Sequence, residues 1–396
     1  MKNFLCILVV SVLSASAQAA SLLPAGANDQ VPAVLSAPRA KALTATLDRV
    51  PVRISHALDA NAALDTAAPY VAQSREFWSE VGETELRAGV RLTTTAPGAV
   101  VRLSPQGGAG AALDPAGVLV RAAGHTRSAA DASAAVADAK ALRSAGMAVP
   151  EGTLAFRLGA DTSGEVEIAA PHAQGRYLVH VFEPASSLVL SLSADHDTVL
   201  AGTPVTFRTG VSPGARLKVA SGLVTAPDGY SMDLAFARNA DGTFSATFTP
   251  DAAHRTGPQL WEAHVFTASD SARGSVLRDA KTAFAVSDAS ARFAGGVRFE
   301  QRTDGVHVNL DLASTSASRY QISAVLYGTG TDGALHAAAL AQSAAWIGGD
   351  RGSIDLGFDA ASLGSLHAPF ELRDLRLLDQ ASMSLIERRE RALRID

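Results

Sequence analysis

The sequence predicts an all-β protein made of tandem β-sandwich domains of the immunoglobulin-like kind, with one short helical insertion in the first domain. The same phrase, a strand, a Pro-containing corner and a second strand, occurs at residues 164–182 and 241–266, and a looser echo follows at 352–358. Apolar and polar side chains alternate within these strands, which is the period of a strand with one face in a core. A length of 396 residues suits two or three such domains better than one.

The first residues have the pattern of a secretory signal peptide, which we place at residues 1–19. Lys2 supplies a positive charge, an apolar stretch runs from 4 to 13, and a small-x-small cleavage site occupies 17–19. The single cysteine, Cys6, lies inside this segment, so the mature chain is expected to form no disulfide. We expect an exported protein, periplasmic or extracellular, with no membrane anchor in the mature chain.

Residues 20–50 are expected to form a flexible leader or linker, at most loosely docked. The segment is rich in Ala, Ser and Pro, and Pro24, Pro32 and Pro38 interrupt it. It shows no sustained hydrophobic period, which is typical of a linker.

Residues 51–187 are expected to form the N-terminal domain, of the β-sandwich type. A hairpin is predicted at 90–103, and further strands at 117–121 and 153–158. These short strands with turn signals between them favour a sandwich over a helical fold.

One segment of this domain predicts a helix, near residues 128–145. Ser128 has helix-start chemistry and opens an Ala-rich run that ends near Gly146. Because the run has few large aliphatic side chains, we expect the helix to lie on the sheet surface. The aromatic pair Phe77-Trp78 either packs in the core, which is the commoner fate of such residues, or lines a cleft.

Residues 188–288 are expected to form an immunoglobulin-like domain and residues 289–396 a C-terminal β-sandwich domain. In the former, strands recur every eight to twelve residues or so, as a Greek-key sandwich requires. Trp261 is expected in its core. In the latter, the hairpin at 297–312 has an aliphatic face and a polar face expected to meet water. The polar face carries His307, Asn309 and Asp311.

The sequence contains no motif that carries catalysis, so we name no catalytic residue, no metal ligand and no cofactor. The nucleophile elbow, the Ser-x-x-Lys pair, the His-Glu-x-x-His zinc motif, the calcium loop and the Walker loop are absent. A triad assembled from residues far apart in the sequence stays open, because spatial proximity is not visible in a sequence.

Two groups of residues have a chemical and a structural interpretation. Asp195-His196-Asp197 could contribute to a calcium site, but two acids do not fill its oxygen shell, and a turn is favoured. His180 and His264 occupy matching places in the repeated phrase, and we expect each to bond a neighbouring strand or loop rather than a metal.

The charge of the chain excludes some partners. The formal net charge is −5, with basic residues scattered among acidic ones, so there is no footprint for nucleic acid. The partner is therefore expected to be a protein or a glycan of unknown identity, and the binding residues are not identified from the sequence.

Several phrases resemble the secreted bacterial family known as domain of unknown function 4785. They extend over nearly the whole expected mature chain and occur at residues 74–78, 93–105, 177–184, 321–328 and 371–379. The resemblance implies an exported protein with immunoglobulin-like C-terminal domains. It implies no reaction and no catalytic residues.

These observations favour an exported, non-enzymatic, multi-domain binding or adhesion-type protein, with the first domain as its functional part. The alternative is a secreted hydrolase or a protease-associated accessory protein. A cleft that gathers His125 or His172 with carboxylates and a serine would favour the alternative.

Overall fold

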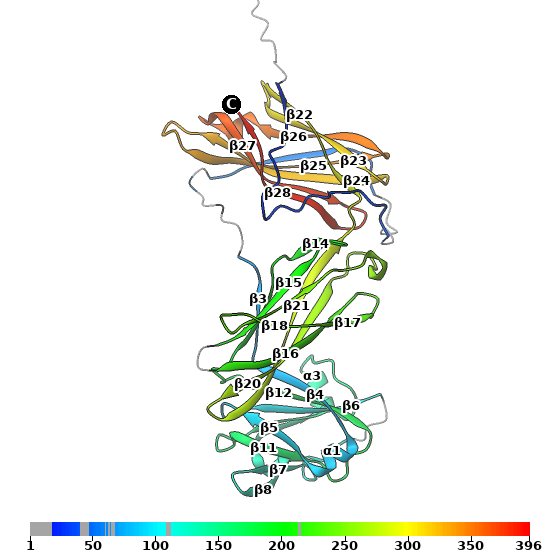
Figure 1. Cartoon of the computed structure of the whole chain (residues 1–396), viewed down its shortest axis with the longest axis vertical. Helices are drawn as coiled ribbons and strands as arrows, with labels where there is room; N and C mark the ends of the chain where they lie inside the picture. The colour runs from blue at the N-terminus through cyan, green and yellow to red at the C-terminus, as the bar shows by residue number, and fades with distance from the viewer. Residues whose placement is uncertain are drawn as a thin grey trace, which may run out of the picture.

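The structure, a computed structural model, describes residues 18–39, 47–59, 61, 64, 68–107, 112–212 and 215–396. Three β-sandwich domains follow one another along the long axis, with the C-terminal domain at one end and the first domain at the other (Figure 1). Four short α-helices occur among the described residues, and strands dominate. The predicted fold class is confirmed. Residues 1–17 of the expected signal peptide lie outside the described residues.

The C-terminal domain packs a four-stranded sheet, ordered β1-β22-β23-β26, on a five-stranded sheet, ordered β2-β25-β24-β27-β28. The strands of the first sheet are β1 (Gln18–Ala20), β22 (Ala291–Arg302), β23 (Gly305–Ser314) and β26 (Arg351–Asp359). Those of the second are β2 (Val52–Ala57), β24 (Ser318–Thr329), β25 (Leu335–Ile347), β27 (His367–Asp379) and β28 (Ser384–Ile395), and α4 (Ala360–Leu363) follows β26. The predicted aliphatic face of β23 points into the core, where Val306, Val308, Leu310 and Leu312 are buried.

The expected flexible leader needs correction, because residues 21–39 form an N-terminal strap docked on the C-terminal domain. Gln30 and Arg388 of β28 exchange both backbone hydrogen bonds, at 3.0 and 2.9 Å. The amide of Leu23 donates to the carbonyl of Ala392, and Leu22 packs against the core. The strap pairs in isolated places along β28 rather than as a regular strand, which is why its sequence shows no period. Residues 40–46 lie outside the described residues.

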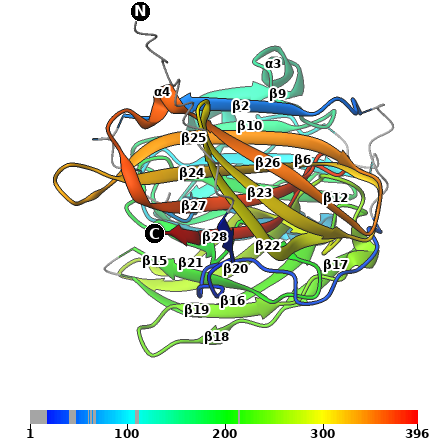
Figure 2. The same cartoon turned by 90° about the horizontal axis from the view of Figure 1, so that it is seen from above.

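The two strands that follow the strap were expected in the first domain, but they belong to sheets of the C-terminal and middle domains. β2 pairs with β25 and lies beside it at the sheet edge (Figure 2). β3 (Val71–Ser74) pairs with β13 (Leu190–Ala194) of the middle domain. Neither strand belongs to the first domain, so the expected start of that domain at residue 51 needs correction. A strand completes its hydrogen bonds on any open sheet edge, and its own sequence does not say which one.

The middle domain consists of a five-stranded sheet, β18-β19-β15-β13-β3, packed on β17-β16-β20-β21, with β14 parallel to β21. Its strands are β13 (Leu190–Ala194), β14 (Thr198–Leu200), β15 (Val205–Val211), β16 (Arg216–Thr225), β17 (Ser231–Leu234), β18 (Ala237–Arg238), β19 (Phe244–Phe248), β20 (Trp261–Ser271) and β21 (Gly274–Ser287). A 3-10 turn, η1 (Ala252–His254), follows β19. Trp261 is buried in this core, as predicted.

The first domain packs the sheet β4-β12-β6-β10-β9 against the sheet β5-β11-β7-β8. Its strands are β4 (Glu76–Gly82), β5 (Val90–Thr94), β6 (Val100–Gln106), β7 (Leu119–Ala122), β8 (His125–Ser128), β9 (Ser133–Asp138), β10 (Leu154–Leu158), β11 (Gly164–Ala169) and β12 (Arg176–Phe182). Its helices are α1 (Glu83–Ala88), α2 (Ala129–Ala132) and α3 (Ala139–Ser144). Phe77 is buried in this core, whereas Trp78 is half-buried on the outer face.

The single helix expected near 128–145 needs correction, because a strand divides it. Ser128 caps α2 as predicted, since its hydroxyl accepts from the amide of Asp131 at 3.1 Å. The chain then forms β9 on the open edge of β10, and Asp138 caps the second helix, α3. Alanine favours helix only weakly against a sheet edge that offers a row of unpaired backbone groups.

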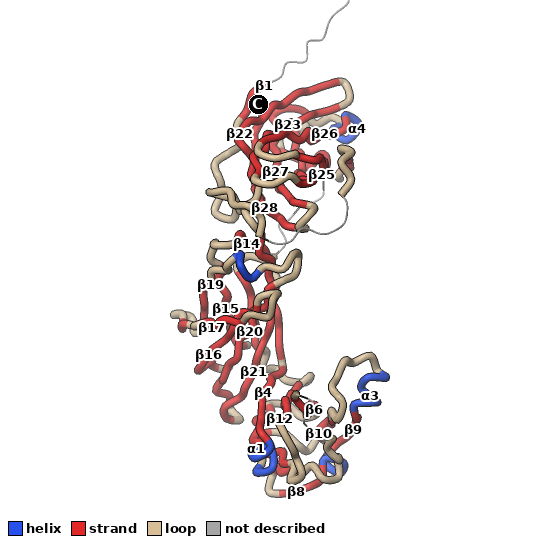
Figure 3. Tube along the Cα trace, turned by 90° about the vertical axis from the view of Figure 1, so that its right-hand side faces the viewer, coloured by secondary structure: helices blue, strands red, loops and turns tan. Residues whose placement is uncertain are grey.

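One sheet passes from the middle domain into the first. Asp279 of β21 pairs with Glu76 of β4, and Figure 3 shows these strands following each other along the long axis. Near this passage, the side chains of Arg278 and Glu183 form an ion pair that is completely buried. Glu183 also accepts from the amide of Ala96, at 3.1 Å. The first domain is therefore joined to the middle domain by backbone pairing and by buried polar contacts.

Candidate functional site

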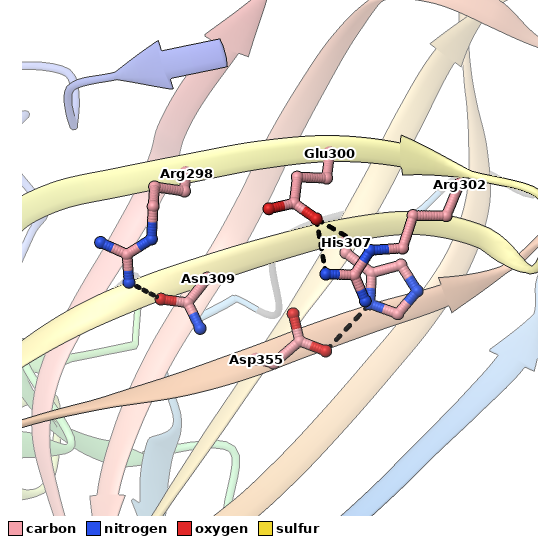
Figure 4. A pocket seen from close by; sticks show the side chains of 6 residues that line it. All are labelled: Arg298, Glu300, Arg302, His307, Asn309 and Asp355. Atoms are coloured by element: carbon pink, nitrogen blue, oxygen red, sulfur yellow. Dashed lines mark hydrogen bonds and ion pairs between the residues drawn. The ribbon is translucent and has the colours of Figure 1, made fainter. Parts of the chain in front are cut away.

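A polar pocket lies on the outer face of the C-terminal domain, over β22, β23 and β26 (Figure 4). Its volume is about 270 Å³. Successive side chains of a strand point to opposite faces, so alternate residues of these strands reach the pocket while their neighbours fill the core. The pocket is lined by Arg298, Glu300, Arg302, His307, Asn309 and Asp355.

The strand register brings these side chains together. Arg298 of β22 lies opposite Asn309 of β23, which lies opposite Asp355 of β26. In the next row Glu300 lies opposite His307, and the place on β26 opposite His307 is taken by Gly357. Side chains directly opposite each other on one face are close enough to interact.

Arg53 of β2 occupies the space that Gly357 leaves open. A Cβ at position 357 would lie only 2.8 Å from Cδ of Arg53. The Nη1 atom of Arg53 donates to Oδ2 of Asp355 at 2.9 Å and lies 3.2 Å from Nδ1 of His307. The N-terminal part of the chain therefore supplies a neighbour of the pocket.

The two arginines of β22 that line the pocket are held by acceptors on the same face. Nε of Arg302 donates to Oε2 of Glu300 at 2.8 Å, and this hydrogen bond, which is the largest cause, raises the pKa of Arg302 above its ordinary value. Nη2 of Arg298 donates to the amide oxygen of Asn309, and also to Oδ1 of Asp311 at 3.1 Å. Both guanidinium groups are therefore positioned before any ligand arrives.

His307 lies between two carboxylates at the end of the pocket. Its Nδ1 is 2.9 Å from Oδ2 of Asp355, and its Nε2 is 3.2 Å from Oδ1 of Asp304. Burial alone would raise the pKa of Asp304, but the charge and hydrogen bond of His307 lower it below its ordinary value. The His307 side chain is only 4% exposed, so the expectation that it faces water needs correction. The surrounding charged side chains cover it.

The pocket is lined by groups that form hydrogen bonds with a polar ligand. The lining side chains are guanidinium, carboxylate, amide and imidazole groups, and none is a serine, threonine, cysteine or lysine nucleophile. Donors and acceptors alternate over the face, and each charge already has a partner of opposite sign or a hydrogen-bonding amide. A polar ligand would meet a preformed set of hydrogen-bonding groups.

The two histidines of the repeated phrase lie outside this pocket, on the outer face near the passage between the middle and first domains. Nε2 of His180 is 2.8 Å from Oε2 of Glu76 on the neighbouring strand, which confirms the predicted structural contact. The His180 ring also stacks on Trp78, with centroids 3.9 Å apart. Nε2 of His264 lies 3.5 Å from Oδ1 of Asp279 on the adjacent strand β21.

The segment Asp195-His196-Asp197 lies in the short connection between β13 and β14. Oδ1 of Asp195 accepts from the amide of Thr206 at 3.0 Å, and Nδ1 of His196 lies 3.2 Å from the same oxygen. In the part of the chain that the structure describes, no group of three or more His, Cys, Asp or Glu side chains is arranged to hold a metal ion.

The structure does not bring the two histidines of the hydrolase alternative into a cleft with a serine. His125 begins β8, His172 follows β11, and both side chains are exposed. Among the described residues, neither ring has a hydrogen-bond or ion-pair partner.

The pocket residues were only partly visible in the sequence. The hairpin predicted at 297–312 includes Arg298 and Glu300, and its expected polar face carries His307 and Asn309. The register that sets these strands side by side, and the approach of Arg53 from far along the chain, needed the tertiary structure. The alternation of charged residues at 298, 300 and 302 was the available signal.

Comparison with known proteins identifies the family. Models of the N-terminal and C-terminal domains of the domain of unknown function DUF4785 match residues 43–183 and 290–396. The chain belongs to the DUF4785 family. A crystal structure of a DUF4785 family protein from Legionella pneumophila is similar over 90% of this chain and 98% of that chain, at 17% identity and a TM-score of 0.67. This likeness shows a shared fold.

Other comparisons add no functional evidence. A tetra-tandem repeat from the extending region of a large adhesion protein matches at 14% identity over 77% of this chain and 68% of that chain. Its TM-score of 0.19 is too low to support a structural relationship. No curated protein matches the sequence. Within the described residues, no helix has the length and apolar character needed to cross a membrane.

Proposed function

We propose that this DUF4785 protein is an exported, non-enzymatic binding protein of the adhesion type. In this proposal it contacts its partner through the pocket on β22, β23 and β26 of the C-terminal domain, and not through the first domain, where the sequence led us to expect the functional part. The observation that carries the proposal is the chemistry of the pocket lining. It offers several planar hydrogen-bonding groups on one open face, with no serine, threonine, cysteine or lysine among them. The partner is a protein or a glycan.

The way in which the side chains of the pocket are held in place favours ligand binding. Its side chains project from a sheet whose other face is buried in the core, and Arg302 and Arg298 are held by Glu300 and Asn309. Groups positioned in advance lose less conformational entropy when a ligand binds. This preorganisation is a property of binding surfaces on rigid scaffolds.

Export is part of the proposal and rests on the signal-like residues 1–19. The test is to express the full chain in a bacterial host and measure the intact mass of the protein recovered from periplasm and medium. The expected mass is that of a chain beginning at Ala20. Recovery of the full-length mass from the cytosol alone would contradict export.

The binding proposal is tested by thermal melting of the mature chain against a panel of glycans and peptides. A ligand that binds the native state raises the melting temperature by mass action. We expect the shift to be lost in Arg302→Ala and kept in Arg176→Ala, a matched arginine of an exposed ion pair on the first domain. A shift that both variants keep would place binding elsewhere. Turnover of a panel compound by the wild-type chain would overturn the non-enzymatic assignment.

A further inference from the structure

We infer that the pocket takes a neutral sugar unit of a glycan, held by hydrogen bonds to its hydroxyl groups and not by stacking on an aromatic ring. This inference rests on the proposed function and narrows its ligand class.

The balance of charge points to a neutral ligand. Two arginines in the lining, Arg298 and Arg302, face two carboxylates, Glu300 and Asp355. In Figure 4, the carboxylates come from the strands on either side of β23, so neither sign of charge is gathered at one end. An anionic group in the pocket would meet a carboxylate, and a cationic group would meet a guanidinium. A ligand without net charge avoids both conflicts.

The unused hydrogen-bonding atoms alternate in kind. The bonds that Arg302 makes to Glu300 go to Oε2, which leaves Oε1 as an acceptor. Among the described residues, the contacts of Asp355 are at Oδ2, which leaves Oδ1 as a second acceptor. Within the part of the chain that the structure describes, Asn309 accepts through its oxygen and keeps its amide N–H groups, and Arg298 bonds through Nη2. The open face therefore presents separated donors and acceptors.

A hydroxyl group fits such a face because it donates one hydrogen bond and accepts others. Neighbouring hydroxyls of a sugar ring can each accept from an arginine or asparagine N–H and donate to a carboxylate oxygen. This arrangement leaves the Arg302–Glu300 pair intact. A zwitterionic amino acid would need its ammonium and carboxylate groups to compete with that pair, so it fits less well.

The absence of an aromatic side chain in the lining sets the expected affinity. The lining contains no Phe, Tyr or Trp, so the face of a sugar ring has no stacking partner there. Partly exposed hydrogen bonds contribute little net free energy because water competes for each group. We therefore expect weak binding of a single sugar unit, roughly in the millimolar range of dissociation constants. Useful affinity would then require several units or copies.

The experiment titrates the full mature chain with probes of four charge classes and follows binding by ligand-observed NMR. The probes are methyl glycosides of glucose, galactose and mannose as neutral sugars, glucuronic acid as an anion, glucosamine as a cation and glycine as a zwitterion. We expect at least one neutral sugar to bind more tightly than the charged probes, since only it avoids a like-charge contact.

Two substitutions locate the site. Glu300→Gln keeps the size of the side chain but removes a charged acceptor, and Asn309→Ala removes the amide donors. Glu300→Gln is expected to weaken binding of the neutral sugar about tenfold, as loss of a hydrogen bond to a charged group predicts. Asn309→Ala is expected to weaken it by about two- to tenfold, because the amide donors are neutral. The matched control is Glu80→Gln, which alters an exposed Glu–Arg pair on a strand of the first domain. Its affinity should equal that of the wild type, and melting curves verify that all variants are folded.

The outcomes separate the inference from the proposed function. Preferred binding of the anionic, cationic or zwitterionic probe, or failure of every neutral sugar, would overturn the sugar assignment. If another ligand binds and Glu300→Gln weakens it, the pocket remains the binding site with a different ligand class. If a neutral sugar binds equally well to both pocket variants, the sugar site lies elsewhere and the inference is overturned.

Discussion

At the scale of single residues, the centre of the middle domain depends on Trp261. Its ring is buried and lies 5.9 Å from the ring of Phe248 and 6.1 Å from that of Phe284. Trp261→Ala is expected to lower the free energy of unfolding by about 3–5 kcal/mol, because the removed ring leaves a cavity that the rigid sandwich fills incompletely. Urea unfolding measures this loss.

The neighbouring Leu260 is the control for this substitution. Its side chain is 57% exposed, so Leu260→Ala should change the free energy of unfolding by about 0.5 kcal/mol at most. Equal losses in the two variants would show that the repeated strand does not bury Trp261 in the way described.

A second residue-scale prediction concerns acid stability at the passage between the first and middle domains. The hydrogen bond from His180, which is the largest cause, lowers the pKa of Glu76 below its ordinary value of 4.5. A carboxyl group with a lowered folded-state pKa stabilises the fold above the ordinary value, and this contribution is lost as the pH falls through the folded-state value. Glu76→Gln should therefore be less stable than the wild type near neutral pH. In acid, the two proteins should become equally stable.

Thermal melting of wild type and Glu76→Gln from pH 7 downward checks this sign. The gap between their melting temperatures should narrow below about pH 4.5. Because the Glu76 side chain is 39% exposed, solvent screening keeps the gap small even at neutral pH. A gap that widens in acid would mean that the Glu76 contact does not favour the charged carboxylate.

At the scale of elements, the N-terminal strap shows how an irregular segment is held. The side-chain Nε2 of Gln30 donates to the carbonyl groups of Leu385 and Ile386, each at 3.0 Å. Gln30→Ala removes both bonds and is expected to cost about 1–2 kcal/mol of unfolding free energy. The amide of Arg388, which donates to the backbone of Gln30, should then exchange faster with solvent deuterium.

Asn28 is the matched control within the same strap. Its amide makes one exposed contact to Glu390, at 3.4 Å. Asn28→Ala should change the free energy of unfolding by about 0.5 kcal/mol at most. The exchange rate of the Arg388 amide should stay close to that of the wild type. If Gln30→Ala behaved in the same way, the strap would be held by its apolar and backbone contacts alone.

At the scale of the whole molecule, each domain boundary contains a buried Arg–carboxylate pair. Arg278 pairs with Glu183 between the middle and first domains. Arg255 of the middle domain pairs with Asp288 at the entry to the C-terminal domain and donates to Ser384 at 3.2 Å. The chain also crosses the boundary between the first and middle domains twice, from β3 to β4 and from β12 to β13. These contacts favour a stiff row of domains.

Glu183→Gln tests this stiffness. The substitution keeps the shape but leaves the buried guanidinium of Arg278 without its counter-charge, which is expected to cost about 3–5 kcal/mol. Small-angle X-ray scattering should then show increased mobility between domains. Glu80→Gln, in an exposed pair, should change neither quantity. An unaltered scattering curve with an unaltered unfolding free energy would contradict the role given to this pair.

Much of the fold was accessible from local patterns. Alternation in β23 placed Val306, Val308, Leu310 and Leu312 on the core face, and Ser128 marked the start of a helix. Alternation and capping depend on neighbours a few residues away, so the sequence displays them directly. The length of that helix was not accessible, because the open edge of β10 competed with helix formation over residues 133–138.

By itself, the sequence determined the strand faces, the corners, the all-β class and the family of this protein. The tertiary structure alone decided which edge each early strand joins, as when β2 completes the C-terminal sheet and β3 the middle one. It also assembled the pocket, where Glu300 and Asp355 come from separate strands and Arg53 approaches Asp355 from a third. The physical reason is that a side chain's face follows from local backbone period, whereas its neighbours follow from register and edge pairing between segments far apart in the chain.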